Sequence, residues 1–239
     1  MVKLSVNINK IALIRNSRGK NTPHLLKAAE NIIGFGADGI TVHPRPDERH
    51  IRKQDVYDLK AHLSVELNVE GYPSEDFLRM VETVKPAQVT LVPDAPNALT
   101  SDSGWNTVKH KHLLLAVILR LQAAGIRTSL FVAPEMEMIE GAKEIGTNRI
   151  ELYTEAFADG FSKGNKSAVE PYSQAADFAH ALGLGINAGH DLTVHNLRYF
   201  IENVKHLDEV SIGHAIVSEA LYNGLEATIQ AYKGCLRND

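Results

Sequence analysis

The chain has 239 residues, of which 44% are hydrophobic, and its 25 basic and 29 acidic side chains give a formal net charge of −4. This composition is typical of a globular protein and argues against a disordered, fibrous or membrane protein. Because the charges are mixed and form no long basic block, we expect no nucleic-acid partner.

Short β-branched runs alternate along the whole chain with longer stretches whose apolar residues recur every three or four positions. The short runs predict eight strands, at 4–8, 39–43, 64–69, 88–92, 127–132, 149–153, 184–188 and 209–212. The longer stretches predict eight helices, at 23–34, 53–62, 74–84, 108–124, 135–145, 166–182, 193–203 and 216–236.

Several predicted helices end in a glycine shortly before the next strand, and glycine tolerates the left-handed conformation that closes a helix. A βα unit repeated eight times predicts an α/β fold, a single-domain (β/α)8 TIM barrel over residues 1–239. A doubly wound sheet is the alternative, but residues 6–10 lack the glycine-rich phosphate turn that usually follows its first strand.

Cys235 is the only cysteine and cannot form a disulfide within the chain, while residues 1–10 alternate like a strand and do not resemble a signal peptide. The longest aliphatic run, 113–119, has seven residues, against the roughly 20 needed to cross a bilayer. We therefore expect a cytoplasmic protein with no membrane span.

The longest predicted connection, residues 93–107, follows the fourth strand, and a second long connection, 154–165, follows the sixth. Loops of this length inside a compact domain are uncommon and are often lids over a site. A surface excursion without a function is the alternative for residues 93–107.

Polar side chains gather at the ends of the predicted strands, where barrel enzymes form their active sites. They are Asn7, Asn9, His43, Arg45, Glu70, Glu151, Asn187, His190, Gly213 and His214. An imidazole can pass protons in both directions near neutral pH, and a partly desolvated carboxylate becomes a usable base there. His43 and Glu70 are therefore predicted to form an acid/base pair; a structural hydrogen bond between them is the alternative.

Basic side chains cluster after the first two strands, and guanidinium groups suit phosphate oxygens. They are Arg15, Arg18, Arg45, Arg49, His50 and Arg52. Residues 211–215 form a small-residue turn that opens the last helix, where backbone N–H groups can bind a second anion. Together the two groups predict a pair of phosphorylated substrates or a bisphosphate, although each alone could be solvated surface.

The sequence lacks a helical His-Glu-x-x-His, a cysteine pair or a dense acidic set at the strand ends, so we expect no metal. No serine or cysteine stands out as a nucleophile. Apart from Lys10, no lysine at a strand end offers a Schiff base.

Several long, ordered motifs resemble the pyridoxine 5'-phosphate synthase family. They lie at residues 6–9, 13–19, 36–43, 47–51, 91–93, 187–190 and 212–216. The resemblance spans nearly the whole chain. It implies a barrel enzyme of vitamin B6 biosynthesis that joins 3-amino-2-oxopropyl phosphate to 1-deoxy-D-xylulose 5-phosphate and closes the pyridine ring with loss of phosphate and water. Because the amine comes from a substrate and each step is a proton transfer, the implied reaction needs no cofactor, whether metal, flavin or nicotinamide.

The resemblance also implies roles for individual residues. His43 and Glu70 match the two proton-transfer residues on the deoxyxylulose side, His190 matches a proton donor at the opposite face, and Glu151 matches a carboxylate that stabilises the transition state. The positions that match the deoxyxylulose phosphate site are Arg45, His50 and Thr100. The positions that match the amino ketone phosphate site are Asn7, Arg18, Gly213 and His214. The family further suggests a homo-oligomer built from dimers, possibly an octamer.

Three expected substrate contacts depart from the commoner family pattern. Asn9 and Lys10 replace an acid and an imidazole, and Asp191 stands where a glycine usually follows the active histidine. Lys10 can still pair with an anion and Asn9 can still bond hydroxyls, whereas Asp191 would repel phosphate unless it is turned away or paired.

Two other functions fit parts of the pattern. A different phosphosugar barrel enzyme, an isomerase or aldolase, would share the fold and the anion sites. A non-catalytic metabolite-binding barrel would keep the arginines but would have no use for His43, Glu70 and His190 together.

Overall fold

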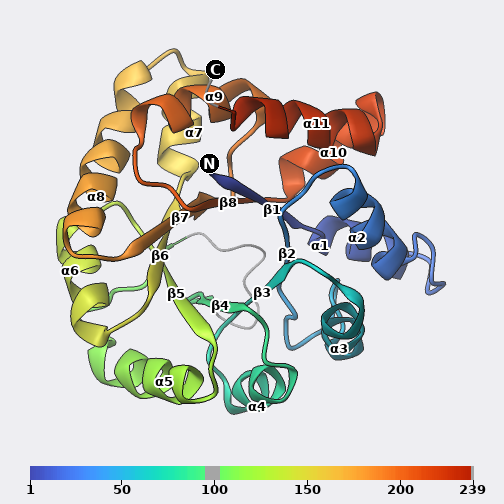
Figure 1. Cartoon of the computed structure of the whole chain (residues 1–239), viewed down its shortest axis with the longest axis horizontal. Coiled ribbons are helices and arrows are strands. Elements are labelled where there is room, and N and C mark those ends of the chain that lie inside the picture. Colours follow the sequence, from blue (N-terminus) through green and yellow to red (C-terminus); the bar gives the residue numbers. More distant parts are fainter. Residues whose placement is uncertain (95–102, 238–239) are drawn as a thin grey trace.

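The computed structural model describes residues 1–94 and 103–237, which form one closed barrel of parallel strands, β1 to β8. Each strand pairs with the next along the chain, and β8 pairs with β1 to complete the circle (Figure 1). This arrangement confirms the predicted (β/α)8 barrel and excludes the doubly wound sheet.

The strands lie within two residues of the positions predicted from the sequence. They are β1 (Lys3–Asn7), β2 (Gly39–Val42), β3 (Glu66–Gly71), β4 (Gln88–Leu91), β5 (Arg127–Val132), β6 (Arg149–Tyr153), β7 (Gly185–Gly189) and β8 (Glu209–Ile212).

The helices surround the barrel (Figure 1). They are α1 (Asn9–Asn16), α2 (Leu25–Gly34), α3 (Lys53–His62), α4 (Glu75–Val84), α5 (Lys111–Ala123), α6 (Met136–Ile145), α7 (Glu155–Ser162), the 3₁₀ helix η1 (Lys166–Val169), α8 (Glu170–Ala181), α9 (Val194–Asn203), α10 (His214–Asn223) and α11 (Leu225–Cys235). No helix in the described ranges is both long and apolar enough to pass through a bilayer.

Some of these helices differ from the prediction. The connections after β1 and β6 contain α1 and α7, where only loops were expected. The stretch 216–236 was expected to be one helix, but it is divided into α10 and α11 at Gly224, whose φ of 80° lies in the left-handed region.

The inside of the barrel is polar, although the strands are almost wholly buried. Along one inward row, Ser5 lies 2.7 Å from Thr41 between hydroxyl oxygens, and Thr90 donates a hydrogen bond of 3.1 Å to Asn68. The apolar residues that alternate with this row, such as Leu4 in β1, belong to the core between strands and helices. Buried hydroxyls and amides are stable there because they satisfy one another's hydrogen bonds.

This alternation also places the candidate site. Side chains two positions apart along a strand share a face, so the inward row continues toward the carboxyl ends of the strands. Its members there include Asn7, His43, Glu70 and Glu151. The polar interior and the polar ring at the barrel mouth are therefore parts of one sequence pattern.

The connection after β4 returns to the barrel at Trp105, which is 2% exposed. Its indole N–H donates to the Leu91 carbonyl, and its backbone N–H donates to the Phe131 carbonyl. A Cβ on Gly104 would lie 2.4 Å from the Ala133 nitrogen, so this backbone sits directly on the end of β5. Residues 95–102 of the predicted lid lie outside the described residues, and the lid stays a prediction.

Candidate active site

A cavity of about 610 Å³ opens at the carboxyl ends of the strands. Its lining residues come from the strand ends and from the loops and helices that follow them. They are Asn7, Asn9, Lys10, Leu13, His43, Arg45, Arg49, His50, Glu70, Glu151, His190, Asp191, Ser211, Gly213 and His214. This is the face on which barrel enzymes hold their substrates.

Among the described residues that were assigned catalytic or substrate-binding roles, all except Arg18 line this cavity. Arg18 is exposed in the turn after α1, and Thr100 lies outside the described residues. Asn187, which the sequence placed in the polar ring, is fully buried lower in the barrel and accepts a 3.0 Å hydrogen bond from Arg149.

His43 and Glu70 face each other across the ends of β2 and β3. The imidazole Nδ1 lies 4.0 Å from a Glu70 carboxylate oxygen, which is too long for a hydrogen bond. Asn9 fixes the position of His43, because its side-chain oxygen accepts a 2.9 Å hydrogen bond from the His43 backbone N–H. The Asn7 amide lies 3.4 Å from Glu70.

The two groups have shifted proton affinities. Burial, together with the charge of Arg45, holds the pKa of His43 well below its usual range. Burial and the charges of Glu151 and Asp94 raise the pKa of Glu70 well above its usual range. The site therefore favours the neutral imidazole of His43, which can accept a proton, and the protonated carboxyl of Glu70, which can donate one.

Glu151 lies on β6 and is 3% exposed. The Thr90 hydroxyl is 3.4 Å from its carboxylate, and burial together with the charge of Glu209 raises the pKa of Glu151 to about 7. This carboxyl can thus change its protonation near neutral pH in the deepest part of the cavity.

His190 follows β7 in a turn with a φ of 89°, a left-handed conformation that is unusual for a residue with a side chain. The rings of Phe131 and Tyr153 stand edge-on to its imidazole, with centroids 6.3 and 5.6 Å away. Asp191 lies beside it, with a carboxylate oxygen 3.1 Å from His190 Nδ1. The Asp191 carboxylate, which was expected from the sequence to repel phosphate unless turned away or paired, is therefore paired with His190.

On the side of α1 and β2, cationic and imidazole groups line the cavity. Arg45 is 5% exposed and forms an ion pair with Asp94, while Arg49 pairs with Asp47. Burial and the charges of Arg45 and Arg49 lower the pKa of His50 to about 4, so its ring is neutral near pH 7. Lys10 lies exposed on α1 at the cavity edge.

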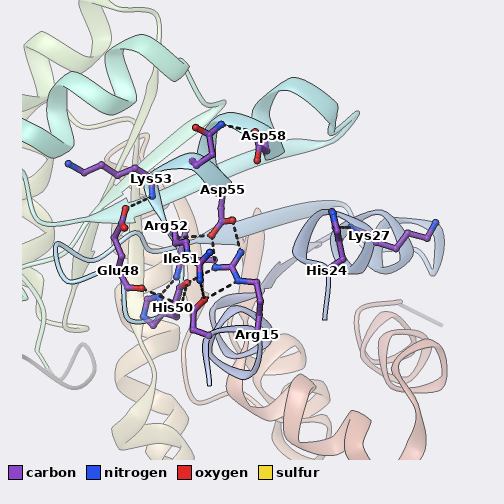
Figure 2. Close-up of polar contacts among 12 residues, drawn as sticks. Arg15, His24, Lys27, Glu48, His50, Ile51, Arg52, Lys53, Asp55 and Asp58 are labelled. Atoms are coloured by element: carbon purple, nitrogen blue, oxygen red, sulfur yellow. Dashed lines mark hydrogen bonds and ion pairs between the residues drawn. The ribbon is translucent and has the colours of Figure 1, made fainter. Parts of the chain in front are cut away.

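Arg15 does not belong to this anion-binding group, contrary to the sequence-based expectation. It is 2% exposed, its guanidinium forms two hydrogen bonds to Asp55, and it donates a third to the His50 carbonyl (Figure 2). Arg52 also points away from the cavity and donates to the Asn16 side chain. These two arginines brace the loop that carries His50.

The part of the cavity wall next to β1 is formed where α10 begins, after β8. Gly213 precedes the helix, and a Cβ there would lie 2.9 Å from the Asn7 side chain, so only glycine allows this close approach. His214 is the first helical residue and is exposed. Ser211, 4% exposed, has a hydroxyl with no hydrogen-bond partner in the described part of the chain.

Sequence reasoning missed three features near the site. Asp94, the buried partner of Arg45, follows β4, so the strand-end rule could have found it. Leu13 lies one turn after Lys10 on α1, a helix that was not predicted. A second cavity of about 380 Å³ shares His43 and Arg45 with the first and is also lined by Asp94.

No cluster of three His, Cys, Asp or Glu side chains suited to a metal ion occurs within residues 1–94 and 103–237.

Comparison with known proteins identifies related sequences. Residues 4–238 match the family described as "Pyridoxal phosphate biosynthesis protein PdxJ". A "Pyridoxine 5'-phosphate synthase" from Christiangramia forsetii is 64% identical, and the match covers 99% of this chain and 100% of the relative. A protein of the same name from Flavobacterium johnsoniae is 59% identical over 97% of this chain and 98% of the relative.

Similar solved structures share the fold at low sequence identity. A 3-keto-L-gulonate-6-phosphate decarboxylase from Vibrio cholerae has a TM-score of 0.65 at 11% identity, covering 98% of this chain and 97% of its own. Phosphoribosyl anthranilate isomerase from Thermotoga maritima has a TM-score of 0.63 at 16% identity, covering 99% and 98%. At such identities the similarity concerns the barrel alone.

Proposed function

The chain belongs to the pyridoxal phosphate biosynthesis protein PdxJ family and is a ring-closing synthase of pyridoxine biosynthesis, and we propose that its reaction takes place in the barrel-mouth cavity. The substrates are 1-deoxy-D-xylulose 5-phosphate and 3-amino-2-oxopropyl phosphate, and the products are pyridoxine 5'-phosphate, phosphate and water. The observation that supports this site best is that four proton-transfer groups, His43, Glu70, Glu151 and His190, line one cavity between two anion-binding regions.

The deoxyxylulose phosphate binds on the side of α1 and β2. Arg45, Arg49 and Lys10 supply positive charge there, and the neutral ring of His50 supplies a hydrogen bond. Asn9 uses its carbonyl oxygen to hold His43, which leaves its amide N–H₂ to meet a substrate hydroxyl. Thr100 completes this group by its position in the family motif.

The amino ketone phosphate binds at the start of α10. The backbone N–H groups of this helix terminus favour an anion, and Gly213 lets the chain approach without a side chain in the way. Asn7 and His214 border the same region, and the Ser211 hydroxyl offers a further hydrogen bond. Arg18, on the turn after α1, is assigned to this phosphate by its position in the family motif.

Condensation begins when the amine of one substrate attacks the ketone of the other and water leaves. The leaving oxygen needs a proton, which the Glu70 carboxyl can donate because its raised pKa favours the protonated form. His43, neutral under the same conditions, can remove a proton from the neighbouring atom. After its proton is lost, Glu70 can act as the base in a later step.

His190 exchanges protons with the other face of the intermediates. Its position across the cavity from the His43 and Glu70 pair suits a step in which an oxygen leaves as the ring closes. Glu151 is almost completely buried in the cavity wall. In its ionised form this carboxylate stabilises positive charge that develops on the nitrogen of the condensed substrates.

We further propose that the whole chain acts as one catalytic unit in the cytoplasm and assembles as a homo-oligomer built from dimers. Apolar side chains exposed on α5, Leu113 and Leu119, are consistent with a covered surface there. Light scattering coupled to gel filtration measures the assembly: a mass equal to one chain would contradict it.

A product assay tests the reaction. Incubation of the enzyme with both phosphorylated substrates should yield pyridoxine 5'-phosphate, detected by its absorbance and mass, and neither substrate alone should be consumed. Conversion of a single sugar phosphate without the other substrate would instead indicate an isomerase or aldolase.

A further inference from the structure

His190 and Asp191 are neighbours in sequence whose side chains are brought together by an unusual turn. Adjacent residues in extended chain point in opposite directions. Here the φ of 89° at His190 folds the backbone so that the Asp191 carboxylate reaches the imidazole Nδ1 at 3.1 Å. A positive φ on a residue with a side chain costs about 1–3 kcal/mol and persists only when its surroundings fix it.

The surroundings do fix this turn. The His190 backbone N–H donates to the Ser211 carbonyl at 3.2 Å, and the Asp191 backbone N–H donates to the Thr154 hydroxyl at 3.4 Å. Thr154, fully buried, in turn donates to the carbonyl of Gly189. Position 189 has no room for a side chain, because a Cβ there would lie 2.2 Å from the Ser211 carbonyl oxygen.

We propose that Asp191 is a positioning residue for His190. Its carboxylate accepts a hydrogen bond from the Nδ1–H group, which fixes the orientation and tautomer of the imidazole. The Nε2 atom is thereby presented for proton exchange with the substrate. This inference rests on the proposed function of the cavity. It gives Asp191 a role through His190 in place of the direct substrate contact expected from the sequence.

The charge of Asp191 also changes how readily His190 holds a proton. Burial alone would lower the pKa of His190, but the hydrogen bond and charge of Asp191, together with the charges of Glu151 and Asp94, outweigh it, so that the pKa is raised. Other ionisable groups that act on this ring include Glu151, Asp94 and His43. The Asp191 carboxylate lies in direct contact with a ring nitrogen, at 3.1 Å from Nδ1.

The Asp191 carboxylate can select the rotation of the His190 ring, which the aromatic contacts cannot do. Phe131 and Tyr153 stand edge-on to the imidazole and limit its tilt, yet neither ring distinguishes Nδ1 from Nε2. A carboxylate does distinguish the two nitrogens, because it accepts a hydrogen bond from the N–H group of the nitrogen that it faces. The contact between Asp191 and His190 can therefore select which ring nitrogen carries the proton, and the aromatic packing cannot.

Nitrogen-15 NMR of histidine-labelled enzyme reads this role without any substrate. The signal of His190 is assigned by its loss in His190→Gln. In the wild-type protein we expect Nδ1 to stay protonated when the ring is neutral. In Asp191→Asn we expect the titration midpoint of His190 to fall by about one unit or more, and in Asp191→Glu we expect most of the shift to be restored.

Kinetics provide the second readout. If His190 donates a proton, Asp191→Asn should lower kcat at least tenfold, within the factor of 10² to 10⁴ for complete loss of an acid. It should also move the basic limb of the pH profile to lower pH, with each KM changing by less than about threefold. Asp191→Glu should recover both properties.

The pair His206 and Asp177 provides a matched control, since an Asp there lies 3.6 Å from an imidazole and neither residue lines the cavity. Asp177→Asn should change neither kcat nor the His190 titration. An unchanged His190 titration in Asp191→Asn, or a rise in KM with an unchanged pH profile, would overturn the inference. Failure of wild-type enzyme to form product would instead overturn the proposed function, and the NMR titration would still test the contact between Asp191 and His190.

Discussion

Arg15 and Asp55 form a two-point ion pair that joins α1 to the first turn of α3. The Nη1–Oδ1 and Nη2–Oδ2 distances are 2.6 and 2.9 Å, and the guanidinium is almost completely buried. The same Asp55 carboxylate accepts the Arg52 backbone N–H at the start of α3. One carboxylate thus caps a helix and neutralises a buried cation beneath the loop that carries His50.

We predict that Asp55→Ala lowers the free energy of unfolding by about 3–5 kcal/mol, because it leaves the buried Arg15 charge without a partner. Urea denaturation followed by circular dichroism measures the change. Glu30→Ala removes the partner of Lys27 in an exposed pair and should change stability by less than about 1 kcal/mol. Equal losses of unfolding free energy in the two variants would mean that the buried Arg15 pair stabilises the fold no more than an exposed ion pair does.

Glu70→Gln should keep the fold and reduce kcat by about 10² to 10⁴, because the amide preserves the shape of the side chain but cannot exchange a proton. Steady-state kinetics with both substrates measure this. Glu140→Gln, an exposed change on α6, serves as the control and should leave kcat unaltered. Normal turnover of Glu70→Gln would remove this residue from the proton-transfer steps.

His43→Asn should lose turnover in a similar way, since the cavity then lacks the neutral imidazole at the end of β2. His62→Asn is the matched change, because His62 is exposed on α3, where its ring Nδ1 lies 2.7 Å from the backbone carbonyl of Asp58. Comparable losses in both variants would show that the assignment of His43 to the reaction is wrong.

Lys10→Ala should weaken apparent binding of 1-deoxy-D-xylulose 5-phosphate by about 1–3 kcal/mol, the range of a lost charge-assisted hydrogen bond. The KM for the amino ketone phosphate should change little, because that substrate is assigned to the start of α10. Lys27→Ala, on α2 and outside the cavity lining, controls for the loss of one surface charge. A change confined to the amino ketone KM would contradict the contact.

Glu209→Gln should alter how stability depends on pH. Burial raises the pKa of Glu209 to about 7 from an ordinary value of 4.5, so the folded protein binds more protons than the unfolded chain between these values. Wild-type stability conferred by this group is therefore present at low pH and lost as pH rises through about 7.

The glutamine variant lacks this titration. Its free energy of unfolding relative to wild type should therefore rise between pH 5 and pH 8, by up to about 3 kcal/mol. Urea denaturation at both pH values gives the comparison, with Glu140→Gln expected to show no such trend. A difference that does not vary with pH would show that the buried carboxyl titrates normally.

The sequence was sufficient for the barrel because its strands and most of its helices differ in period, and both patterns are local. It was insufficient for α1 and α7, since neither helix has a side-chain hydrogen bond at its N-terminus and α7 contains Gly160 in its last turn. Without a capping signal, short helices after a strand look like loops.

The site was predictable to the extent that it depends on position at a strand end. His43, Glu70 and His190 follow buried runs, so their meeting at the mouth follows from the topology. Arg15 and the Asp191 pairing were not predictable in this way. The role of Arg15 depends on Asp55, 40 residues later, and the pairing of Asp191 depends on a backbone angle at its neighbour.

The close packing of the Gly104 and Trp105 backbone on the end of β5 has a practical consequence for protein engineering. Because the backbone there is pressed against Val132 and Ala133, the segment after β4 re-enters the barrel at a fixed point. A chimera that exchanges this segment between related enzymes should therefore place its downstream junction before Gly104. A junction placed after Gly104 would exchange the residues that pack on β5 together with the loop. Any residue larger than glycine at position 104 would then displace the end of β5.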